Sequence, residues 1–189
     1  GWASGDFGNL YYTTDGGTVW NLADSGTELR IWDIGFADNT TGWFVGKQGV
    51  IYKTSNAGQT WNAQVSGISP ETYVDIHFIN DSTGYFAGYD GYILKTPDAG
   101  NTWEFQSSFL EHANLESVQF TSPDTGWIVG RDNTLLKTTD AGKNWEYQLP
   151  KADNPDLFSI HFLDSQRGCF VGDDGTIYVT GNGGALWHF

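Results

Sequence analysis

Residues 84–106 read GYFAGYDGYILKTPDAGNTWEFQ, and they indicate the fold because the chain repeats this pattern. Residues 42–64 read GWFVGKQGVIYKTSNAGQTWNAQ, and residues 126–148 read GWIVGRDNTLLKTTDAGKNWEYQ. Two looser copies start at Gly1 and Gly168. The copies therefore start at residues 1, 42, 84, 126 and 168, with steps of 41, 42, 42 and 42 residues. A nearly constant period of this length indicates a repeat architecture.

Each period contains four short runs rich in β-branched and aromatic residues, and turn-forming residues separate them. Strand a is the apolar run before each Gly-aromatic pair, as at 73–78, and strand b starts at that pair. Strand c leads into the Thr that opens the next turn, and strand d starts at the Trp that closes it. Four antiparallel strands in about 40 to 45 residues are typical of a β-propeller blade.

We therefore predict an all-β fold, a β-propeller of about five four-stranded antiparallel blades, as a single domain or segment over residues 1–189. Strands b, c and d occur five times, whereas strand a occurs four times. The first blade should consequently lack its innermost strand and leave an unpaired edge. We expect upstream residues or a neighbouring chain to supply the missing strand.

The turn between strands c and d carries the sharpest local motif, a Thr followed by Asp or Asn after two residues, Gly after four and Trp after seven. The carboxylate or amide should accept backbone N–H bonds in the turn, the Gly should take a positive φ, and the Trp should pack between neighbouring sheets. Because the motif serves every blade alike, we predict a structural role for its side chains, which are Asp15, Asn56, Asp98, Asp140, Asn182, Trp20, Trp61, Trp103, Trp145 and Trp187.

This turn resembles the Asp-box, or BNR, repeat. The longer pattern, with Asp81-Ser82-Thr83-Gly84-Tyr85 or Asp124-Thr125-Gly126-Trp127 ahead of it, resembles the Ycf48-like, photosystem II assembly factor type of BNR propeller over essentially the whole chain. The resemblance implies a non-enzymatic propeller that binds other proteins, without a cofactor. It also implies an exported location, meaning periplasmic, cell-surface or secreted.

Composition excludes several function classes. The chain has 23 acidic and 9 basic side chains and a formal charge of -14, so it should repel nucleic acids and anionic membrane surfaces. No apolar run approaches the ~20 residues of a membrane span, and the single Cys169 cannot form an internal disulfide. A protein partner should accordingly be neutral or basic, and a glycan is the other possible ligand.

Recognition should occur at the loops that differ between blades, because variable loops on a rigid scaffold usually carry binding. These are the b-to-c turns and the d-to-a loops, the latter at 66–72, 107–114 and 150–156. The binding residues predicted there have the aromatic and charged side chains that anchor interfaces, and they are Tyr89, Phe109, Glu111, His112 and Arg131.

Catalytic alternatives compete with this binding function. A sialidase would need three converging arginines, but Arg30, Arg131 and Arg167 fall on loops that open toward different faces. A glycoside hydrolase needs two facing carboxylates. The acids available in or near the d-to-a loops are Glu28, Glu71, Glu111, Glu116, Asp153 and Asp156. A carbohydrate-binding or glycoside-hydrolase-type propeller therefore remains the alternative to a non-catalytic scaffold.

No metal site is predicted. His77 and His161 hold one strand-a position in two blades, where Gly35 and Gln119 stand in the others, as expected for a polar channel lining. The Asp173-Asp174-Gly175 turn lacks the alternating ligands of a calcium loop, so a bound calcium has no support from the sequence. The lysines that recur in strand c should be solvated stems on the blade surface, and they are Lys53, Lys95 and Lys137.

Overall fold

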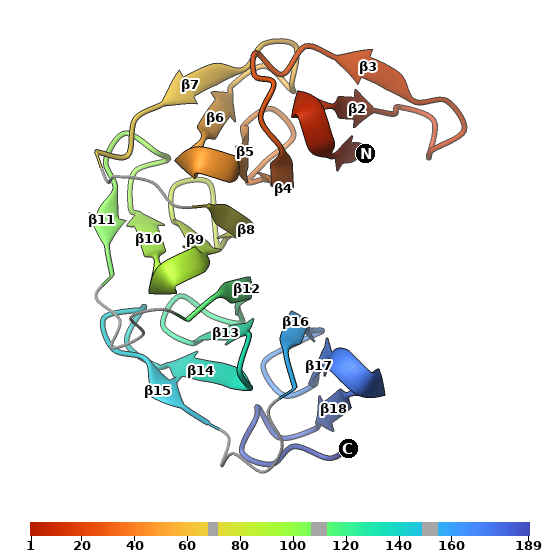
Figure 1. Ribbon diagram of the computed structural model, residues 1–189. Helices are drawn as coiled ribbons and strands as arrows, with labels where there is room; N and C mark the ends of the chain where they lie inside the picture. Colours follow the sequence, from red (N-terminus) through yellow and green to blue (C-terminus); the bar gives the residue numbers. More distant parts are fainter. Residues whose placement is uncertain (68–71, 107–112, 149–154) are drawn as a thin grey trace. The chain divides into compact units, whose positions relative to one another are not determined.

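The structure, a computed structural model, describes residues 1–67, 72–106, 113–148 and 155–189 (Figure 1). These residues form five antiparallel sheets, so the prediction of an all-β fold built from propeller-type blades is confirmed. The helices of the described part are four turns of 3-10 helix, each three residues long. None of the helices in these ranges is both long and apolar enough to cross a membrane.

The elements follow the sequence repeat. Strands β5, β9, β13 and β17 begin at the glycines of the Gly-aromatic pairs. The strands are β1 (Trp2–Ser4), β2 (Leu10–Tyr12), β3 (Asn21–Ala23), β4 (Ile31–Phe36), β5 (Gly42–Gly46), β6 (Ile51–Thr54), β7 (Asn62–Gln64), β8 (Tyr73–Phe78), β9 (Gly84–Gly88), β10 (Ile93–Thr96), β11 (Glu104–Phe105), β12 (Leu115–Phe120), β13 (Gly126–Gly130), β14 (Thr134–Thr138), β15 (Glu146–Tyr147), β16 (Leu157–Phe162), β17 (Gly168–Gly172) and β18 (Ile177–Thr180). The 3-10 turns are η1 (Asp6–Gly8), η2 (Lys47–Gly49), η3 (Tyr89–Gly91) and η4 (Asp173–Gly175).

The chain divides into two compact units. Unit 1 comprises Gly1–Tyr85 and Lys95–Glu104, and unit 2 comprises Phe86–Leu94 and Phe105–Phe189. Unit 1 contains the sheets β1-β2-β3 and β4-β5-β6-β7, and unit 2 contains β12-β13-β14-β15 and β16-β17-β18. The sheet β11-β10-β9-β8 contributes residues to both units. The single-domain assignment of residues 1–189 stays a prediction.

Within each unit, neighbouring sheets pack face to face through an aromatic and aliphatic core. In unit 1 the buried residues of the core are Leu10, Ile31, Phe44 and Trp61. In unit 2 they are Trp127, Val129, Leu135, Leu157, Ile160, Phe162 and Phe170. Strands β5 and β13 are buried along their whole length, so both faces of these strands contribute to the packing.

The first residue of strand b is Gly because the last residue of strand a covers it. A Cβ on Gly42 would lie 2.7 Å from the Phe36 ring, and one on Gly126 would lie 2.5 Å from the Phe120 ring. The register pairs these same residues, Phe36 with Gly42 and Phe120 with Gly126. The repeated Phe and the repeated Gly are therefore two halves of one contact.

The strand-c lysines differ from the solvated stems expected for them. Lys53 Nζ donates to the carbonyl of Ala99 at 2.6 Å and lies 5.1 Å from the Trp43 ring centroid. Lys137 Nζ donates to the carbonyl of Gly183 at 3.2 Å and lies 4.6 Å from the Trp127 ring. Each ammonium thus joins its own sheet to the Asp-box turn of the next, because the ring and the carbonyl compensate its partial burial.

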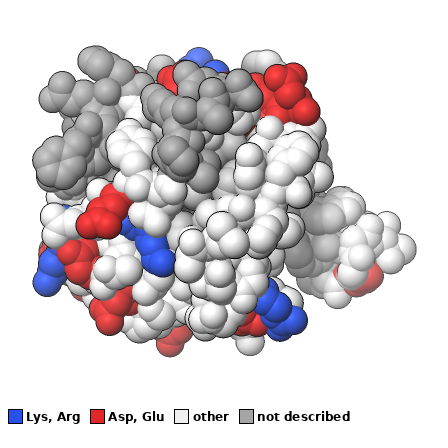
Figure 2. Space-filling model, turned by 90° about the horizontal axis from the view of Figure 1, so that it is seen from below, with Lys and Arg blue, Asp and Glu red and all other residues white. Residues whose placement is uncertain are grey.

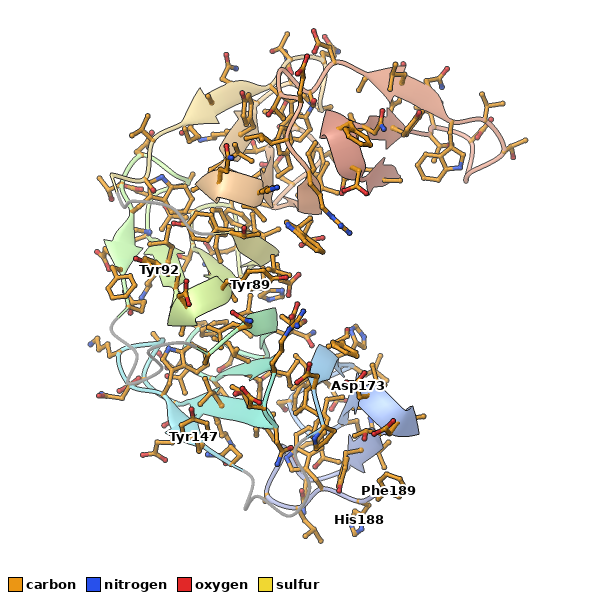
Figure 3. The ribbon with its side chains drawn as sticks, in the orientation of Figure 1. Tyr89, Tyr92, Tyr147, Asp173, His188 and Phe189 are labelled. Atoms are coloured by element: carbon orange, nitrogen blue, oxygen red, sulfur yellow. The ribbon has the colours of Figure 1, made fainter. Side chains whose placement is uncertain are left out.

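The two terminal sheets each have three named strands. Among the residues that the structure describes, the first sheet has no strand a, as predicted, and β1 pairs with β2 alone. In the last sheet the outermost strand is reduced to one bridge between Val179 and His188. Figure 3 shows His188 and Phe189 beside β18, where the Phe189 ring lies 5.5 Å from that of Tyr178.

Candidate functional site

The b-to-c turns have a constant backbone and variable side chains. In four of them the middle residue takes a left-handed conformation with φ between 55° and 58°, and these residues are Phe7, Gln48, Asp90 and Asp174. All four side chains are exposed. Phe7 is the most unusual, since it is an aromatic residue 83% exposed at a position that disfavours bulky side chains. Sequence reasoning missed it, although its place between Gly5 and Gly8 in the repeat marks the turn.

The second residue of strand a adds another side chain beside each turn. The pairing of β4 with β5 shifts between Ile31 and Asp33, and the pairing of β12 with β13 shifts between Leu115 and Ser117. The extra residues are Trp32 and Glu116, and a β-bulge commonly redirects the side chain it carries. We call the b-to-c turns together with the first residues of strand a the loop face of each unit.

On the loop face of unit 2, Arg131 lies beside two carboxylates and an aromatic ring. Arg131 Nε donates to Glu116 Oε1 at 2.8 Å and lies 4.0 Å from Asp156 Oδ2. Its guanidinium carbon lies 6.0 Å from the ring centroid of Tyr89, which sits on the β9–β10 hairpin (Figure 3). Asp156 is itself held by the amide of Asp132 at 3.1 Å. We call Tyr89, Glu116, Arg131 and Asp156 the Arg131 cluster.

The guanidinium of the Arg131 cluster stays charged. The hydrogen bond to Glu116 is the main reason that the pKa of Arg131 is raised, and the nearby carboxylate charges act in the same direction. The arginine side chain is still 45% exposed, whereas the Glu116 side chain is 11% exposed. The cluster therefore presents an oriented guanidinium, with further N–H donors, to the solvent.

The loop face of unit 1 has a similar arrangement. Arg30 Nε lies 3.3 Å from Asp6 Oδ1, and the guanidinium carbon lies 3.6 Å from the Trp32 ring centroid. We call Asp6, Arg30 and Trp32 the Arg30 cluster. Its arginine precedes strand a whereas Arg131 stands in a turn, so two different repeat positions produce one combination of arginine, carboxylate and aromatic ring.

The Asp-box side chains organise the c-to-d turns. Asp15 Oδ1 accepts the amide of Val19 at 3.0 Å, and Asp140 Oδ1 accepts that of Asn144 at 2.9 Å. The preceding threonine shares this work, since Thr54 Oγ1 donates to Asn56 at 2.9 Å and accepts the Gly58 amide at 2.9 Å. Hydrogen bonds lower the pKa of three turn carboxylates, chiefly from the Val19 amide to Asp15, from the Thr102 side chain to Asp98 and from the Asn144 side chain to Asp140.

Three of the Asp-box tryptophans make edge-on contacts with aromatic rings. Trp61 meets the Trp2 ring edge-on at 5.7 Å, and Trp187 meets Trp127 edge-on at 5.6 Å. Trp145 meets Phe120 edge-on at 6.0 Å and is buried. Trp20, in the first sheet, is 45% exposed.

The structure places the other candidate residues as follows. Phe109, Glu111 and His112 lie outside the described residues, as do Glu71 and Asp153. Each of the three arginines has its own carboxylate, Arg167 being bound to Asp164 at 2.7 Å. The binding role of the loop residues stays a prediction.

The polar strand-a residues make contacts between sheets. In unit 2, Gln119 Nε2 donates to the carbonyl of Phe162 at 3.1 Å, and Gln119 Oε1 accepts the amide of the same residue at 2.5 Å. In unit 1, the amide of Ile76 donates to Asp33 at 3.1 Å. Across the ranges that the structure describes, no group of three His, Cys, Asp or Glu side chains could hold a metal ion.

Charged side chains are dispersed on the surface drawn in Figure 2, where acidic and basic residues stand among uncharged ones. This fits the composition, because 17% of the residues are charged and acidic residues outnumber basic ones. The aromatic and arginine residues of the two clusters are consequently local features in a broadly acidic molecule.

The comparisons with known proteins identify the family. The family model described as photosynthesis system II assembly factor YCF48 matches residues 67–189 of this 189-residue chain. No curated protein sequence matches the chain. YCF48 from Cyanidioschyzon merolae has a TM-score of 0.75 at 16% identity, over 98% of this chain and 66% of that one. A YCF48 bound to a D1 peptide has a TM-score of 0.50 at 15% identity, over 95% and 87%.

Enzymes share the fold as well. The GH74 enzyme of Niastella koreensis has a TM-score of 0.80 at 16% identity, over 99% of this chain and 34% of the enzyme. At such identities structural similarity shows the fold alone. The family model carries more weight, because it matches the repeat sequence itself over well more than half of the chain. The chain therefore belongs to the photosynthesis system II assembly factor YCF48 family.

Proposed function

We propose that this protein is a non-catalytic binding module that holds a segment of another protein on the loop face of unit 2. The observation that carries the proposal is the Arg131 cluster, in which a partly exposed guanidinium is oriented by Glu116 beside the ring of Tyr89. Arginine and aromatic residues are the side chains most often found as anchors in protein interfaces. The Arg30 cluster repeats the same chemistry in unit 1.

The partner segment should be neutral or basic overall. The formal charge of -14 repels acidic segments and attracts basic ones. Within such a segment, main-chain carbonyls would accept bonds from Arg131, while apolar side chains would pack against Tyr89. The YCF48 structure with a bound D1 peptide supports a peptide as the kind of ligand.

A binding assay with matched variants tests the proposal. The probe is a fluorescently labelled D1 peptide, with scrambled versions of different net charge, and the readout is fluorescence anisotropy. Arg131→Ala should weaken binding about tenfold or more, as expected for an interface anchor worth above about 1.4 kcal/mol. Arg167→Ala is the matched control, since it also removes an arginine paired with a carboxylate, but from the turn between β16 and β17. Equal binding by both variants would contradict the proposal.

The exported location is part of the same proposal, and family membership is its support. The test is fractionation of cells that make the protein, followed by detection with an antibody. Recovery in the periplasmic, surface or secreted fraction is expected. Recovery in the cytoplasmic fraction alone would remove this part of the proposal and leave the binding role intact.

A carbohydrate-active propeller is the second candidate, and the similarity to GH74 enzymes favours it. Two carboxylates, Glu116 and Asp156, do lie near each other, but Arg131 stands between them and pairs with both. Incubation with a panel of soluble polysaccharides and measurement of released reducing sugar separate the candidates. Release that disappears in Glu116→Gln would establish the enzyme and overturn the non-catalytic proposal.

A further inference from the structure

We call the contact between two successive sheets a junction, so that the first junction joins β1-β2-β3 to β4-β5-β6-β7 and the second joins the latter to β11-β10-β9-β8. The first junction lacks a lysine contact that the other junctions have. Where Lys53 and Lys137 stand in strand c, the ammonium lies over the strand-b tryptophan and donates to a carbonyl of the next Asp-box turn. Lys95 likewise lies 5.4 Å from the ring of Tyr85. In β2 the equivalent residue is Tyr12, which has no ammonium.

The rest of this first junction keeps the pattern of the second. Trp2 occupies the place of Trp43 and stacks on Phe36 at 5.6 Å, as Trp43 stacks on Phe78 at 4.0 Å. Ala57 occupies the place of Ala99, and their φ angles are 56° and 59°. Their amides donate to Thr40 and Ser82 at 2.8 and 2.7 Å, so the two turns are held in the same way.

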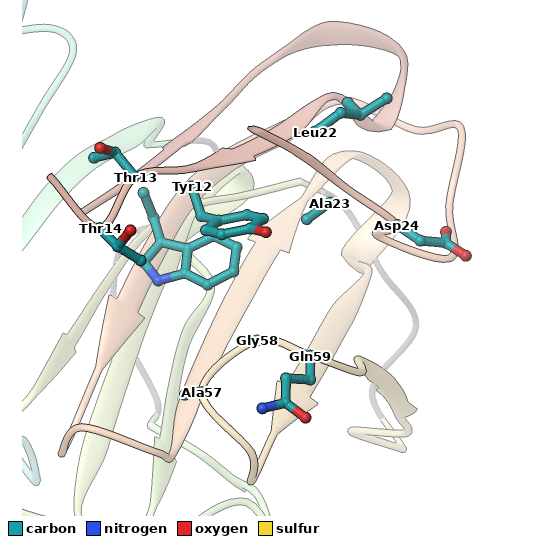
Figure 4. Close-up of a pocket in the computed structure, with 10 residues that line it drawn as sticks. Tyr12, Thr13, Thr14, Leu22, Ala23, Asp24, Ala57, Gly58 and Gln59 are labelled. Carbon is teal, nitrogen blue, oxygen red and sulfur yellow. The ribbon is translucent and has the colours of Figure 1, made fainter. Parts of the chain in front are cut away.

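A pocket lies where a lysine would reach across. Its volume is about 650 Å³, within the range of about 300–1,000 Å³ that is usual for ligand sites. Figure 4 shows Tyr12 and Asp24 on one side of this pocket and Ala57 and Gln59 on the other. Trp2 also lines it, and its ring lies 5.5 Å from that of Tyr12 at an angle of 38°.

The chemistry of the pocket suits a cation. Two aromatic rings supply the negative faces that attract an ammonium group. The Ala57 carbonyl is the counterpart of the carbonyl that binds Lys53, and Asp24 adds a carboxylate at the rim. None of the described residues that line the pocket is basic.

We propose that the pocket between β2 and the 57–59 turn binds a lysine side chain of a partner protein. The ammonium takes the place that the chain's own lysines take at the other junctions, over Trp2 and Tyr12 and in reach of the Ala57 carbonyl. This inference rests on the proposed binding function and adds a second, separate contact point, distinct from the loop face.

Nuclear magnetic resonance of the ¹⁵N-labelled full chain tests the lysine pocket. The probe is the tripeptide acetyl-Gly-Lys-Gly-amide, and the control ligand replaces lysine by norleucine, which has the same alkyl chain without the ammonium. Saturable shifts of the Trp2 indole N–H and the Gly58 amide are expected with the lysine probe, at an affinity at least about tenfold tighter than with norleucine. Absence of shifts at these groups, or equal affinity for both ligands, would overturn the inference.

Two variants at one position make the test specific. Tyr12→Lys installs the residue found at the other junctions, so it should fill the site and weaken probe binding at least about tenfold. Tyr12→Phe keeps the ring and should bind within about twofold of the parent chain. Far-UV circular dichroism checks that both variants are folded. Because the first of them copies a junction already present in this chain, loss of fold in Tyr12→Lys would itself contradict the assumed equivalence of the junctions.

The lysine pocket and the loop face can fail separately. If Arg131→Ala weakens D1 peptide binding but the lysine probe leaves Trp2 unshifted, the pocket is refuted and the proposed function stands. If the probe binds as expected but no loop-face variant changes peptide binding, the loop-face proposal is refuted and the pocket stands.

Discussion

The first and second junctions of unit 1 are built from the same parts with one exchange. Both stack a tryptophan of strand b on a phenylalanine of the next strand a, Trp2 on Phe36 and Trp43 on Phe78. The second is closed by Lys53, whereas the first has Tyr12 and an open pocket. A repeat therefore fixes how blades pack, and a single substitution inside it can turn a structural contact into a potential binding site.

The largest expected difference between the two junctions is the loss of unfolding free energy when the strand-b tryptophan is replaced. Trp43 is fully buried, so Trp43→Ala should lower the free energy of unfolding by about 3–5 kcal/mol. Trp2 is partly exposed, and Trp2→Ala should cost about 1–3 kcal/mol because less apolar area is lost. Urea denaturation followed by circular dichroism measures both. Equal losses would show that the open pocket does not loosen the first junction.

The second-largest effect on stability should come from replacing Gly58, the turn glycine that lies against the Trp2 ring. A Cβ on Gly58 would lie 2.1 Å from the Trp2 ring, and φ there is 79°. Gly58→Ala should cost about 2–4 kcal/mol, combining left-handed strain with overpacking.

Gly16→Ala is the matched control for this effect. Gly16 has a φ of 74°, and a Cβ added there would meet nothing within 4 Å. The substitution should cost about 1–2 kcal/mol from backbone strain alone. Similar values for the two variants would mean that Trp2 moves aside freely.

Removing the ammonium from the second junction should have a smaller effect. Lys53→Met keeps an unbranched side chain over Trp43 but leaves the Ala99 carbonyl without its bond. A loss of about 1–2 kcal/mol is expected, with Tyr12→Lys giving a gain of up to about 1 kcal/mol at the first junction. Chemical denaturation at low and high salt measures both changes. A stabilised Lys53→Met would show that the lysine contributes nothing to the junction.

Lowering the pH should destabilise the first junction more than the second. The turn that holds Ala57 is closed by Asp38, whose pKa is lowered to about 2 chiefly by the backbone amide of Thr40. The turn that holds Ala99 is closed by Asn80, which does not titrate. Because the folded pKa is depressed, the contribution of Asp38 is present above its ordinary pKa of about 3.8 and is lost as pH falls toward 2.

The shift of the Ala57 amide signal between pH 5 and pH 2 measures this acid effect, and Asp38→Asn should remove most of it. The Ala99 amide is the internal reference. If the two amides respond alike, Asp38 is not the group that titrates. The effect should be the smallest of the four, since Asp38 is fully exposed to solvent.

Much of the fold follows from the repeat. The Gly-aromatic pairs predicted where strand b begins, and the Phe before them ends strand a, because that ring covers the glycine. The Asp-box pattern likewise predicted a turn of hydrogen bonds, although it did not reveal that the threonine hydroxyl bonds to both the Asp or Asn and the Gly amide. Such local features are accessible because the interacting residues are separated by a few positions.

The candidate site was harder to predict. Tyr89 and Arg131 were chosen because their loops vary, but the positions of Tyr89 and Asp156 beside Arg131 depend on the packing of neighbouring sheets. Glu116 and Trp32 depend on a bulge, which no residue pattern in strand a announces. Lys53 was misjudged as solvated, because its carbonyl partner, Ala99, lies 46 residues further along the chain.

The period, the strands and the turn chemistry could all be predicted from the amino-acid sequence. Those features depend on spacing within one repeat, and the repeat occurs five times in the chain. The sequence did not predict which side chains meet between neighbouring sheets, and these pairs are Arg131 with Asp156, Lys53 with Ala99, and Tyr12 opposite Ala57. Packing of neighbouring sheets joins residues that are far apart in the sequence. The effect of having Tyr12 where β6, β10 and β14 have Lys can therefore be interpreted only when the residues packed against it are known.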